Sequence, residues 1–559
     1  MLPDVRAVVH EMAMLVHGTF GPRGREVLVM CPPAAPIMTS SGYTIFHCAA
    51  SATGKANPIS QLLLQTMRSL YVELGDGVTQ FILMLDLSCD EMHRHASSKH
   101  AWATAFADLA NALPALYATT CMPYATPIPV AFDPHSRQPS TELRDAAQAI
   151  VRTSLAGAFS APAVAYLADM TVDWVFRTVL DDTDLALPTT SVALASIASD
   201  VLAEAKTLLL QLPTGALDES RIGAKHEFYL RHTSYVRAND TKSIAQRFVL
   251  FDGSLSGHND ATLVTVHVQA ATALATSRAS AMWALEKYVA SLAQDASVNL
   301  LLCTGEVSPQ VRDLCRRYGV DVFAYLETDD VLALAKRVGL MYVTSMYDHV
   351  TPAHIGTHTG ALETLRIGGV LYTVFRHLTR AATTRSVPQL RLHGSTKGLT
   401  TQYYYAVKKA LRVLCAWLRD GASLPGGLAP ERAVAMALRT SRPRDLGASV
   451  LTHALLGAWS QLHENLAGVQ TKATLRRGLE PLTTRDDAFL GWVYETRALP
   501  LPGTESVLAS HHVRVGDPGA ANVLHAASRS RRILEVVLDT LRQLARLDGI
   551  YAIKKPCTD

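Results

Sequence analysis

The sequence predicts an α+β protein in which a mostly helical domain is interrupted by an α/β segment and then resumes. Apolar residues recur at helical spacing over about the first 120 residues and again after about residue 400. Between residues 227 and 372, short runs of β-forming residues alternate with helical patterns, which is typical of a small domain with a parallel sheet. A chain that leaves a helical region and returns to it predicts a discontinuous domain.

The N-terminal part is predicted to hold helices joined by glycine-rich turns. A first helix carries an apolar stripe formed by Val5, Val8, Met12, Leu15 and Val16, and Gly18 is placed to end it. The segment TFGPRGREVLVM then predicts a turn followed by a strand. A further helix begins at Asn57-Pro58, because Pro is favoured at the first helical position, and ends at Leu74-Gly75. Residues 141–210 again read as helical.

Three apolar runs define the α/β segment. They are VNLLLCTG, VDVFAYL and LMYVTS, and helical patterns over residues 311–317 and 331–337 separate them. This βαβαβ order predicts a parallel sheet. After it, residues 405–419 predict a helix that ends in the turn ASLPGGLAP. The last helix carries an apolar stripe formed by Leu534, Val537, Leu538, Leu541 and Leu544.

Length and composition exclude several classes of protein. At roughly 100–200 residues per domain, 559 residues predict about three to five domains. A hydrophobic content of 48% excludes disorder as the main state. The net charge of +3, without a dense basic patch, predicts neither a nucleic-acid nor an anionic-membrane partner. No apolar stretch reaches the ~18 residues of a membrane span, and eight cysteines without a CxxC motif indicate a reduced, cytosolic compartment.

Four glycine-rich segments mark the candidate site. GPRG at 21–24, SSG at 40–42, GDGVT at 75–79 and PGG at 425–427 each lie beside a predicted helix terminus. Glycine lets backbone N–H groups approach an anion, and a helix N-terminus adds a favourable dipole. Asp76 can offer a carboxylate to Mg²⁺ and Thr79 a hydroxyl to a phosphate. None of the segments matches the P-loop pattern.

Taken together, these segments resemble the group II chaperonins. GPRG is similar to their GPKG phosphate loop, TSSGYTIF to TNDGATIL, and the helix ending in GDGVT to one ending in GDGTT. KALRVLCAWLRDGASLPGG is similar to DALCVVKRVLESGSVVPGG, and LARLDGIYAI resembles the closing LRIDDII. The resemblance covers nearly the whole chain in the right order. It implies a multidomain α+β chaperonin fold.

The resemblance also implies three domains. A mostly helical, discontinuous equatorial domain would comprise residues 1–133 and 401–559, and a small intermediate domain residues 134–225 and 373–400. An α/β apical domain would comprise residues 226–372. Because only Met1–Asp4 precede the first helix, either the start codon is misassigned or strand pairing between subunits is altered.

In this family the glycine segments surround an ATP site, so the resemblance implies ATP and Mg²⁺ as cofactors, with Asp76 as the metal ligand. The nucleotide-binding residues carried over are Thr19, Phe20, Gly21, Pro22, Gly42, Asp76, Gly77, Val78, Thr79, Gly427 and Asp517. No catalytic residue is carried over.

Two positions depart from the family. Its hydrolytic aspartates, in NDG and at the start of DAL, are here Ser41 and Lys409. Losing a positioned base typically slows a reaction by ~10²–10⁴, and an ammonium group accepts no proton from water unless its pKa falls greatly. We therefore expect ATP binding without efficient hydrolysis. We further expect a Lys409–Asp76 ion pair that replaces the metal and closes the pocket without ATP, the alternative being that Lys409 points to solvent.

The departures, together with the C-terminal stretch from Val515 to Ile553, resemble the McKusick–Kaufman/Bardet–Biedl group of chaperonin-like proteins. That resemblance implies assistance in assembling a ciliary complex, the BBSome, with the cytosolic chaperonin and other chaperonin-like subunits as partners and BBSome subunits among the polypeptide clients. It implies a cytoplasmic location, at the centrosome or basal body. Two alternatives stay open: an ATP-hydrolysing subunit of a chaperonin ring, and a small-molecule enzyme built on the α/β segment. No GxGxxG motif follows VNLLLCTG to favour the enzyme.

Overall fold

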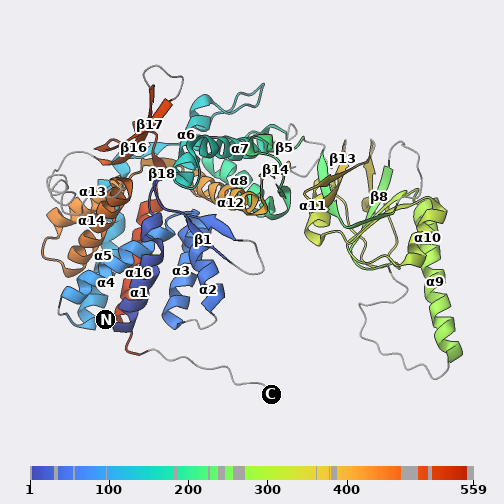
Figure 1. Ribbon diagram of the computed structural model, residues 1–559, viewed down its shortest axis with the longest axis horizontal. Coiled ribbons are helices and arrows are strands. Elements are labelled where there is room, and N and C mark those ends of the chain that lie inside the picture. The colour runs from blue at the N-terminus through green and yellow to red at the C-terminus, as the bar shows by residue number, and fades with distance from the viewer. Residues whose placement is uncertain are drawn as a thin grey trace. The chain divides into compact units, whose positions relative to one another are not determined.

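The computed structural model describes residues 3–30, 36–53, 57–95, 97–181, 186–224, 227–236, 246–255, 271–359, 362–376, 378, 387–467, 489–500 and 507–549 (Figure 1). The chain forms two compact units. Unit 1 comprises Met1–Val175, Leu187–Leu202 and Thr401–Asp559, and unit 2 comprises Phe176–Ala186 and Ala203–Thr400. The unit boundaries fall inside α7 (Ala161–Leu180), α8 (Ser191–Leu208) and α12 (Lys397–Asp420), and between Ala186 and Leu187.

Unit 1 is mostly helical. Its other helices are α1 (Pro3–Val16), α2 (Gly42–Thr53), α3 (Pro58–Leu74), α4 (Val78–Arg94), α5 (Lys99–Thr120), α6 (Thr141–Leu155), α13 (Ala429–Ser441), α14 (Leu446–Ala467) and α16 (Arg529–Ala545). Its strands are β1 (Val27–Val29), β2 (Ile37–Thr39), β3 (Thr126–Pro127), β15 (Ala422–Pro425), β16 (Gly491–Pro500), β17 (Val507–Gly516) and β18 (Leu524–Ala526). They form the sheets β1-β2, β18-β15-β3 and β16-β17.

The core of unit 1 lies between its long helices. α16, red in Figure 1, packs against α4 and α5, while α4 also packs against α1 and α14. The predicted stripe of α16 is confirmed, because all five of its leucine and valine residues are fully buried. The predicted start of α3 is also confirmed, with Asn57 as its N-cap and Pro58 in its first turn. In α1, by contrast, Leu15 is 49% exposed, so its place in the predicted stripe was wrong.

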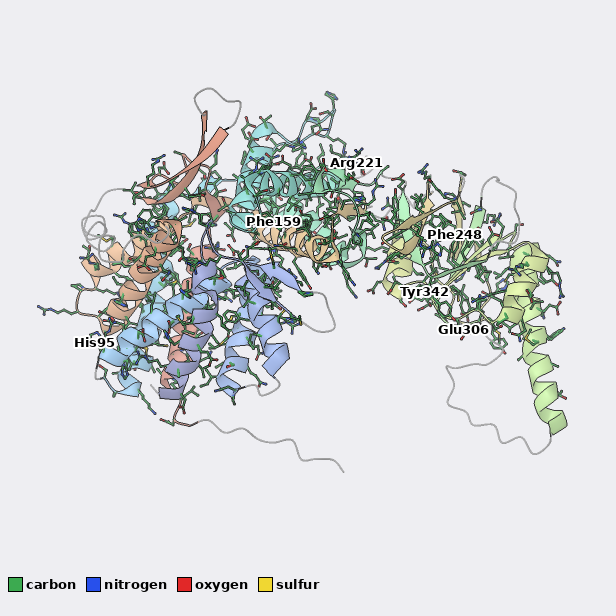
Figure 2. The ribbon with its side chains drawn as sticks, viewed as in Figure 1. His95, Phe159, Arg221, Phe248, Glu306 and Tyr342 are labelled. Atoms are coloured by element: carbon green, nitrogen blue, oxygen red, sulfur yellow. The ribbon has the colours of Figure 1, made fainter. Side chains whose placement is uncertain are left out.

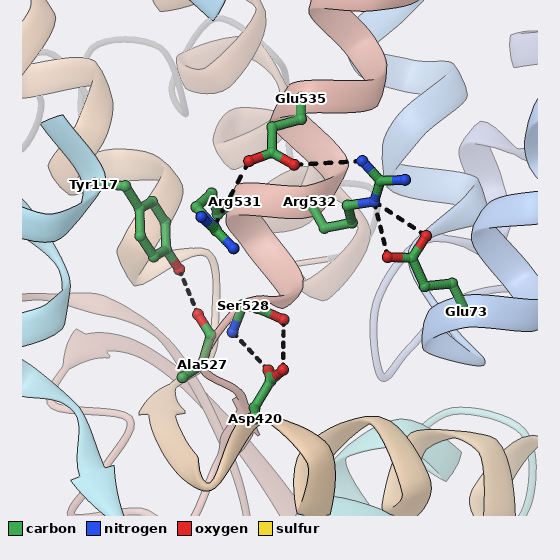
Figure 3. Close-up of polar contacts among 8 residues, drawn as sticks. All are labelled: Glu73, Tyr117, Asp420, Ala527, Ser528, Arg531, Arg532 and Glu535. Carbon is green, nitrogen blue, oxygen red and sulfur yellow. Dashed lines mark hydrogen bonds and ion pairs between the residues drawn. The ribbon is translucent and has the colours of Figure 1, made fainter. Parts of the chain in front are cut away.

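Polar contacts fix the start of α16 (Figure 3). The Asp420 carboxylate accepts hydrogen bonds from the backbone N–H of Ser528, at 2.7 Å, and from its hydroxyl, at 2.8 Å. Tyr117 donates its hydroxyl to the carbonyl of Ala527, at 3.0 Å. One turn later, Arg532 pairs with Glu73 of α3, at 2.8 Å. These contacts place the first turn of α16, which carries Arg529 of the candidate site described below.

We expect Asp420→Ala to lower the free energy of opening of α16 by about 1–2 kcal/mol, because Ser528, the N-cap residue of α16, loses two hydrogen bonds to that carboxylate. Hydrogen exchange of the α16 amides measures this change. The matched control is Asp539→Ala, which removes an exposed pair with Arg542 on the same helix and should change the opening by less than about 0.5 kcal/mol. Equal losses in the two variants would contradict this stabilising role of Asp420.

Unit 2 holds α9 (Ala271–Gln294), α10 (Pro309–Tyr318), α11 (Thr328–Val338) and three sheets. A five-stranded sheet has the order β11 (Ile355–His358), β8 (Gln246–Phe251), β9 (Leu300–Cys303), β10 (Asp321–Ala324) and β7 (Ser234–Val236). A second sheet has the order β12 (Glu363–Ile367), β13 (Val370–Phe375) and β6 (Phe228–His232). A third has the order β4 (Leu209–Leu212), β14 (Leu390–His393) and β5 (Arg221–Ile222).

The predicted parallel sheet is present, since β8, β9 and β10 are parallel to one another. Phe248 of β8 is fully buried, with its ring centroid 6.0 Å from that of Phe375 (Figure 2). The prediction of a strand at LMYVTS was wrong: only Val343 pairs, in an isolated bridge to Phe251. One edge of β8 pairs with β9, and the other edge pairs with β11 from Gln246 to Val249. Only the end of β8 beyond Val249 is left to pair with residues 340–345, which is enough for one bridge but not for a strand.

A second correction concerns ASLPGGLAP, predicted as a turn. Its first four residues form β15, which pairs with β18 and β3, and the turn is confined to the residues before α13. The apolar tail GIYAI lies outside the described residues apart from Gly549. Among the helices of the described residues, none is long and apolar enough to cross a membrane.

Candidate functional site

The structure brings ten of the eleven predicted nucleotide-binding residues to the wall of one cavity in unit 1. The cavity has a volume of about 260 Å³. The predicted residues that line it are Thr19, Phe20, Gly21, Pro22, Gly42, Asp76, Gly77, Val78, Thr79 and Gly427. Asp517 is not among its lining residues; its carboxylate accepts a hydrogen bond from the N–H of Gly519, at 2.8 Å. As nucleotide ligands, these residues remain predictions.

The GDG turn holds Asp76 between two helices. Gly75 ends α3 with a φ of 74° and donates its N–H to Tyr71, at 2.9 Å, and Gly77 precedes α4 with a φ of 94°. A Cβ atom at Gly75 would lie 2.6 Å from Arg412, and one at Gly77 would lie 2.6 Å from Ile533. Because side chains rarely adopt positive φ and neither position has room for one, both residues must be glycine. The turn thereby directs the Asp76 carboxylate into the cavity.

Four helices begin at the cavity. Gly42 and Arg529 are the first residues of α2 and α16, Val78 is the first of α4, and Leu428 precedes α13. Among the residues that the structure describes, no side chain caps the N-terminus of α4 or of α13. Since a helix N-terminus carries a partial positive charge and unsatisfied N–H groups, their convergence favours an anion in the cavity.

Asp76 is paired with two cations. Its Oδ1 lies 3.4 Å from Lys409 Nζ, and its Oδ2 lies 3.2 Å from the guanidinium of Arg529. The predicted Lys409–Asp76 ion pair is therefore present, and Lys409 does not point to solvent. The expectation that this pair closes the pocket was wrong, because a cavity of about 260 Å³ remains beside it. Burial alone would raise the pKa of the Asp76 carboxyl, but Lys409 and Arg529 outweigh burial and hold that pKa far below its usual range. Asp76 is thus fully ionised near neutral pH.

Other contacts hold the two cations in place. Lys409 donates a hydrogen bond to the carbonyl of Ser154, at 2.6 Å. Arg529 donates to the side-chain oxygen of Gln80, at 3.1 Å, and Gln80 donates in turn to the buried carboxylate of Glu431, at 2.7 Å. Burial, reinforced by Arg529, lowers the pKa of nearby His525 to about 3, so this imidazole is neutral at physiological pH.

Aromatic and aliphatic side chains form the rest of the cavity wall. Trp492 lies 4.5 Å from Trp459 and 4.3 Å from His463, ring centroid to ring centroid, and its indole N–H donates to the Trp459 carbonyl, at 3.0 Å. Tyr43 stacks on Tyr71, at 4.1 Å. Further apolar and aromatic members of the lining are Phe20, Pro22, Val78, Ala156, Leu428, Leu462, Leu466, Tyr494 and Val523. The cavity therefore combines charged and aromatic walls, as a ligand with a phosphate and a flat ring requires.

The residues present do not fit a magnesium ion. Mg²⁺ is usually held by one or two carboxylates together with phosphate oxygens. Among the described residues that line the cavity, Asp76 carries the only carboxylate, and each of its oxygens already faces a cation. The described part of the chain contains no cluster of three or more His, Cys, Asp or Glu side chains that could hold a metal.

Sequence reasoning found the glycine turns, Asp76, Ser41 and Lys409, but it missed Arg529, His525 and Trp492. Ser41, at the position of a hydrolytic aspartate in the resemblance, lines the cavity as expected. The missed residues sit outside the glycine-rich segments, and Arg529 is 453 positions from Asp76 in the chain. No local sequence pattern links residues that are so far apart, so the contact between Arg529 and Asp76 is seen only in the folded structure.

The family model described as the TCP-1/cpn60 chaperonin family matches residues 12–555. Thermosome subunit 3 of Haloferax volcanii is 24% identical over 270 residues, so the match spans about half of that relative: 48% of this chain and 48% of the other. Thermosome subunit alpha of Halobacterium salinarum is 21% identical over 435 residues, which are 77% of this chain and 68% of the other. The crystal structure of a group III chaperonin in the open state is 14% identical, covers 98% of both chains and gives a TM-score of 0.64. This likeness confirms the predicted multidomain α+β fold.

Proposed function

The chain belongs to the TCP-1/cpn60 chaperonin family, and on that premise we propose that it is a chaperonin-type subunit that binds a nucleotide without hydrolysing it efficiently. The observation that carries the proposal is the pairing of Asp76 with Lys409 and Arg529, at 3.4 and 3.2 Å. Among the described lining residues no second carboxylate is present to take a proton from an attacking water. The glycine turns and helix N-termini that favour phosphate nevertheless surround the cavity.

Polypeptides are the proposed clients. Unit 2 exposes large apolar side chains: Trp283 is 64% exposed, Met341 60% and Tyr347 68%. Tyr342, which is labelled in Figure 2, is 43% exposed. Aromatic residues and Met are enriched where proteins bind other proteins, and exposed apolar surface of this kind suits a non-native chain.

The finer proposal is a role with other chaperonin-like subunits and the cytosolic chaperonin in assembling the BBSome, at the centrosome or basal body. It is supported by the resemblance of the C-terminal stretch from Val515 onward, which includes β18 and α16. Affinity purification of the full chain followed by mass spectrometry tests it. Recovery of chaperonin subunits together with BBSome subunits is the expected result, and recovery of neither would contradict the assembly role.

An assay of phosphate release from Mg-ATP tests the proposed lack of hydrolysis. We expect the wild type to release no more phosphate than the Asp76→Ala variant. Turnover by the wild type that Asp76→Ala abolishes would overturn the proposal in favour of an ATP-hydrolysing ring subunit. The retained GDG turn and the open cavity are the features that would serve such a subunit.

A further inference from the structure

We infer that the cavity binds the phosphates of a nucleoside polyphosphate without a divalent cation, with Lys409 and Arg529 standing where the cation would be. The inference rests on the proposed nucleotide-binding function and adds the chemical form of the ligand: the free nucleotide, not its magnesium complex. It starts from the observation that the residues lining the cavity do not fit a magnesium ion.

The two cations are held in position before any ligand arrives. Arg529 is 11% exposed in its side chain and Lys409 22%. Asp76 and Gln80 fix the guanidinium, while Asp76 and the Ser154 carbonyl fix the ammonium. A cation whose orientation is already fixed loses little conformational entropy on binding, and charge-assisted hydrogen bonds to phosphate are stronger than neutral ones.

The charge of the cavity favours an anion even in the absence of a metal. The described residues of its lining include two cations, Lys409 and Arg529, and one carboxylate, that of Asp76, while His525 is neutral. The Glu431 carboxylate lies behind Gln80 and outside the lining. The N-termini of α2, α4 and α13 also lie at the cavity and add partial positive charge. The phosphates of a free nucleotide therefore meet complementary charge directly.

The same arrangement opposes a divalent cation. Asp76 Oδ1 faces Lys409 and Oδ2 faces Arg529, so a metal ion would have to displace one of these side chains from its partner. It would also lie close to the positive charge of the other. A magnesium ion carried in on the nucleotide meets the same repulsion, whereas the bare polyphosphate does not.

The apolar wall distinguishes a nucleotide from an inorganic polyphosphate. Phe20 and Tyr494 line the cavity beside Trp492, whose hydrogen bond to Trp459 and stacking on His463 hold it in place, so this wall offers aromatic surface to a base. Because stacking of a base on an aromatic side chain contributes to affinity, inorganic triphosphate should bind more weakly than ATP.

Isothermal titration calorimetry of the full chain with ATP, in excess EDTA and in excess Mg²⁺, tests the inference. We expect binding in EDTA, with a dissociation constant no weaker than in Mg²⁺. Loss of one charge-assisted contact to phosphate should weaken binding in EDTA by about tenfold or more in both Lys409→Ala and Arg529→Ala. The control is Lys408→Ala, which removes the neighbouring cation of α12 outside the cavity lining and should leave binding unchanged.

Binding that requires Mg²⁺ overturns the inference, and so does the absence of ATP binding in both buffers. The first of these results leaves the proposed lack of hydrolysis intact, because phosphate release is measured separately. Circular dichroism checks that the variants fold, and the Trp492→Phe variant, which should lose the tryptophan fluorescence change on ATP binding, places the ligand in this cavity. Equal affinities for ATP and inorganic triphosphate would overturn the assignment of a nucleotide.

Discussion

The double variant Ser41→Asp, Lys409→Asp is expected to release phosphate from Mg-ATP about 10²–10⁴ times faster than the wild type, the range that a positioned base contributes. Both positions line the cavity, and Lys409 Nζ lies 3.4 Å from Asp76. Exchanging the ammonium for a carboxylate removes the charge that competes with a metal and frees one oxygen of Asp76. Three carboxylates in the cavity lining, at positions 41, 76 and 409, then offer Mg²⁺ the oxygen ligands that it prefers.

A single variant and a neighbouring control distinguish the effect of removing the positive charge of Lys409 from the effect of adding a carboxylate that can act as a base. Lys409→Ala should free one oxygen of Asp76 without supplying a base, so its turnover should stay near that of the wild type. Lys408→Asp adds a carboxylate one residue away in α12, outside the cavity lining, and should not create turnover. If the folded double variant remains as slow as the wild type, Ser41 and Lys409 are not what prevents hydrolysis.

The same variants connect hydrolysis with metal dependence. In the double variant, the carboxylates repel one another unless a cation lies between them, so its ATP binding should become stronger in Mg²⁺ than in EDTA. The wild type should show the opposite preference or none. A change in both properties would mean that the residues at positions 41 and 409 together decide whether ATP binds with Mg²⁺ and whether it is hydrolysed.

The sequence predicted helix ends and turns well, because these depend on residues that are close together in the chain. Asn57-Pro58 starts α3 and Gly75 ends it, because capping and positive φ depend on residues close in the chain. The prediction of a strand at LMYVTS was wrong, because an apolar run alone does not show whether the neighbouring strand still has an unpaired edge. That edge was already taken by β11, which comes later in the sequence.

The residues of the candidate site also fall into two groups: those that local sequence motifs predicted and those that only the fold brings together. Its glycine turns, Asp76 and Lys409 were predictable, because each stands in a short motif that resembles a known one. Arg529 and Trp492 were not, because a helix start and a strand residue acquire their meaning only from packing. Arg529 reaches Asp76 because Asp420 and Tyr117 fix the first turn of α16, and neither contact leaves a pattern in the sequence.

In unit 2, Arg231→Met is expected to lower the free energy of opening of β6 and α11 by about 3 kcal/mol, the lower end of the range for breaking a buried ion pair. The Asp330 carboxylate is 1% exposed and is bound by Arg231 through two hydrogen bonds, of 3.0 and 3.2 Å. The variant leaves this carboxylate buried without its charge partner. The lower end of the range applies because Arg231 itself is 39% exposed.

The pH dependence of this loss identifies its cause. Burial raises the pKa of the Asp330 carboxyl even with Arg231 beside it, and removing Arg231 should raise it further. A group whose pKa is higher in the folded than in the unfolded state stabilises the fold below its unfolded pKa, and this contribution is lost as pH rises through the folded pKa. The deficit of Arg231→Met should therefore be full at neutral pH and shrink as the pH falls through the raised pKa.

Hydrogen exchange of the β6 and α11 amides at several pH values measures this deficit. Arg316→Met is the matched control in unit 2, because it breaks a pair with Asp313 in which both side chains are more than half exposed, and it should change the opening by less than about 0.5 kcal/mol. Adding Asp330→Leu to Arg231→Met should recover most of the loss, since no charge then stays buried. A deficit independent of pH, or one that Asp330→Leu fails to reduce, would mean that Arg231 stabilises unit 2 through the packing of its aliphatic stem and not by neutralising Asp330.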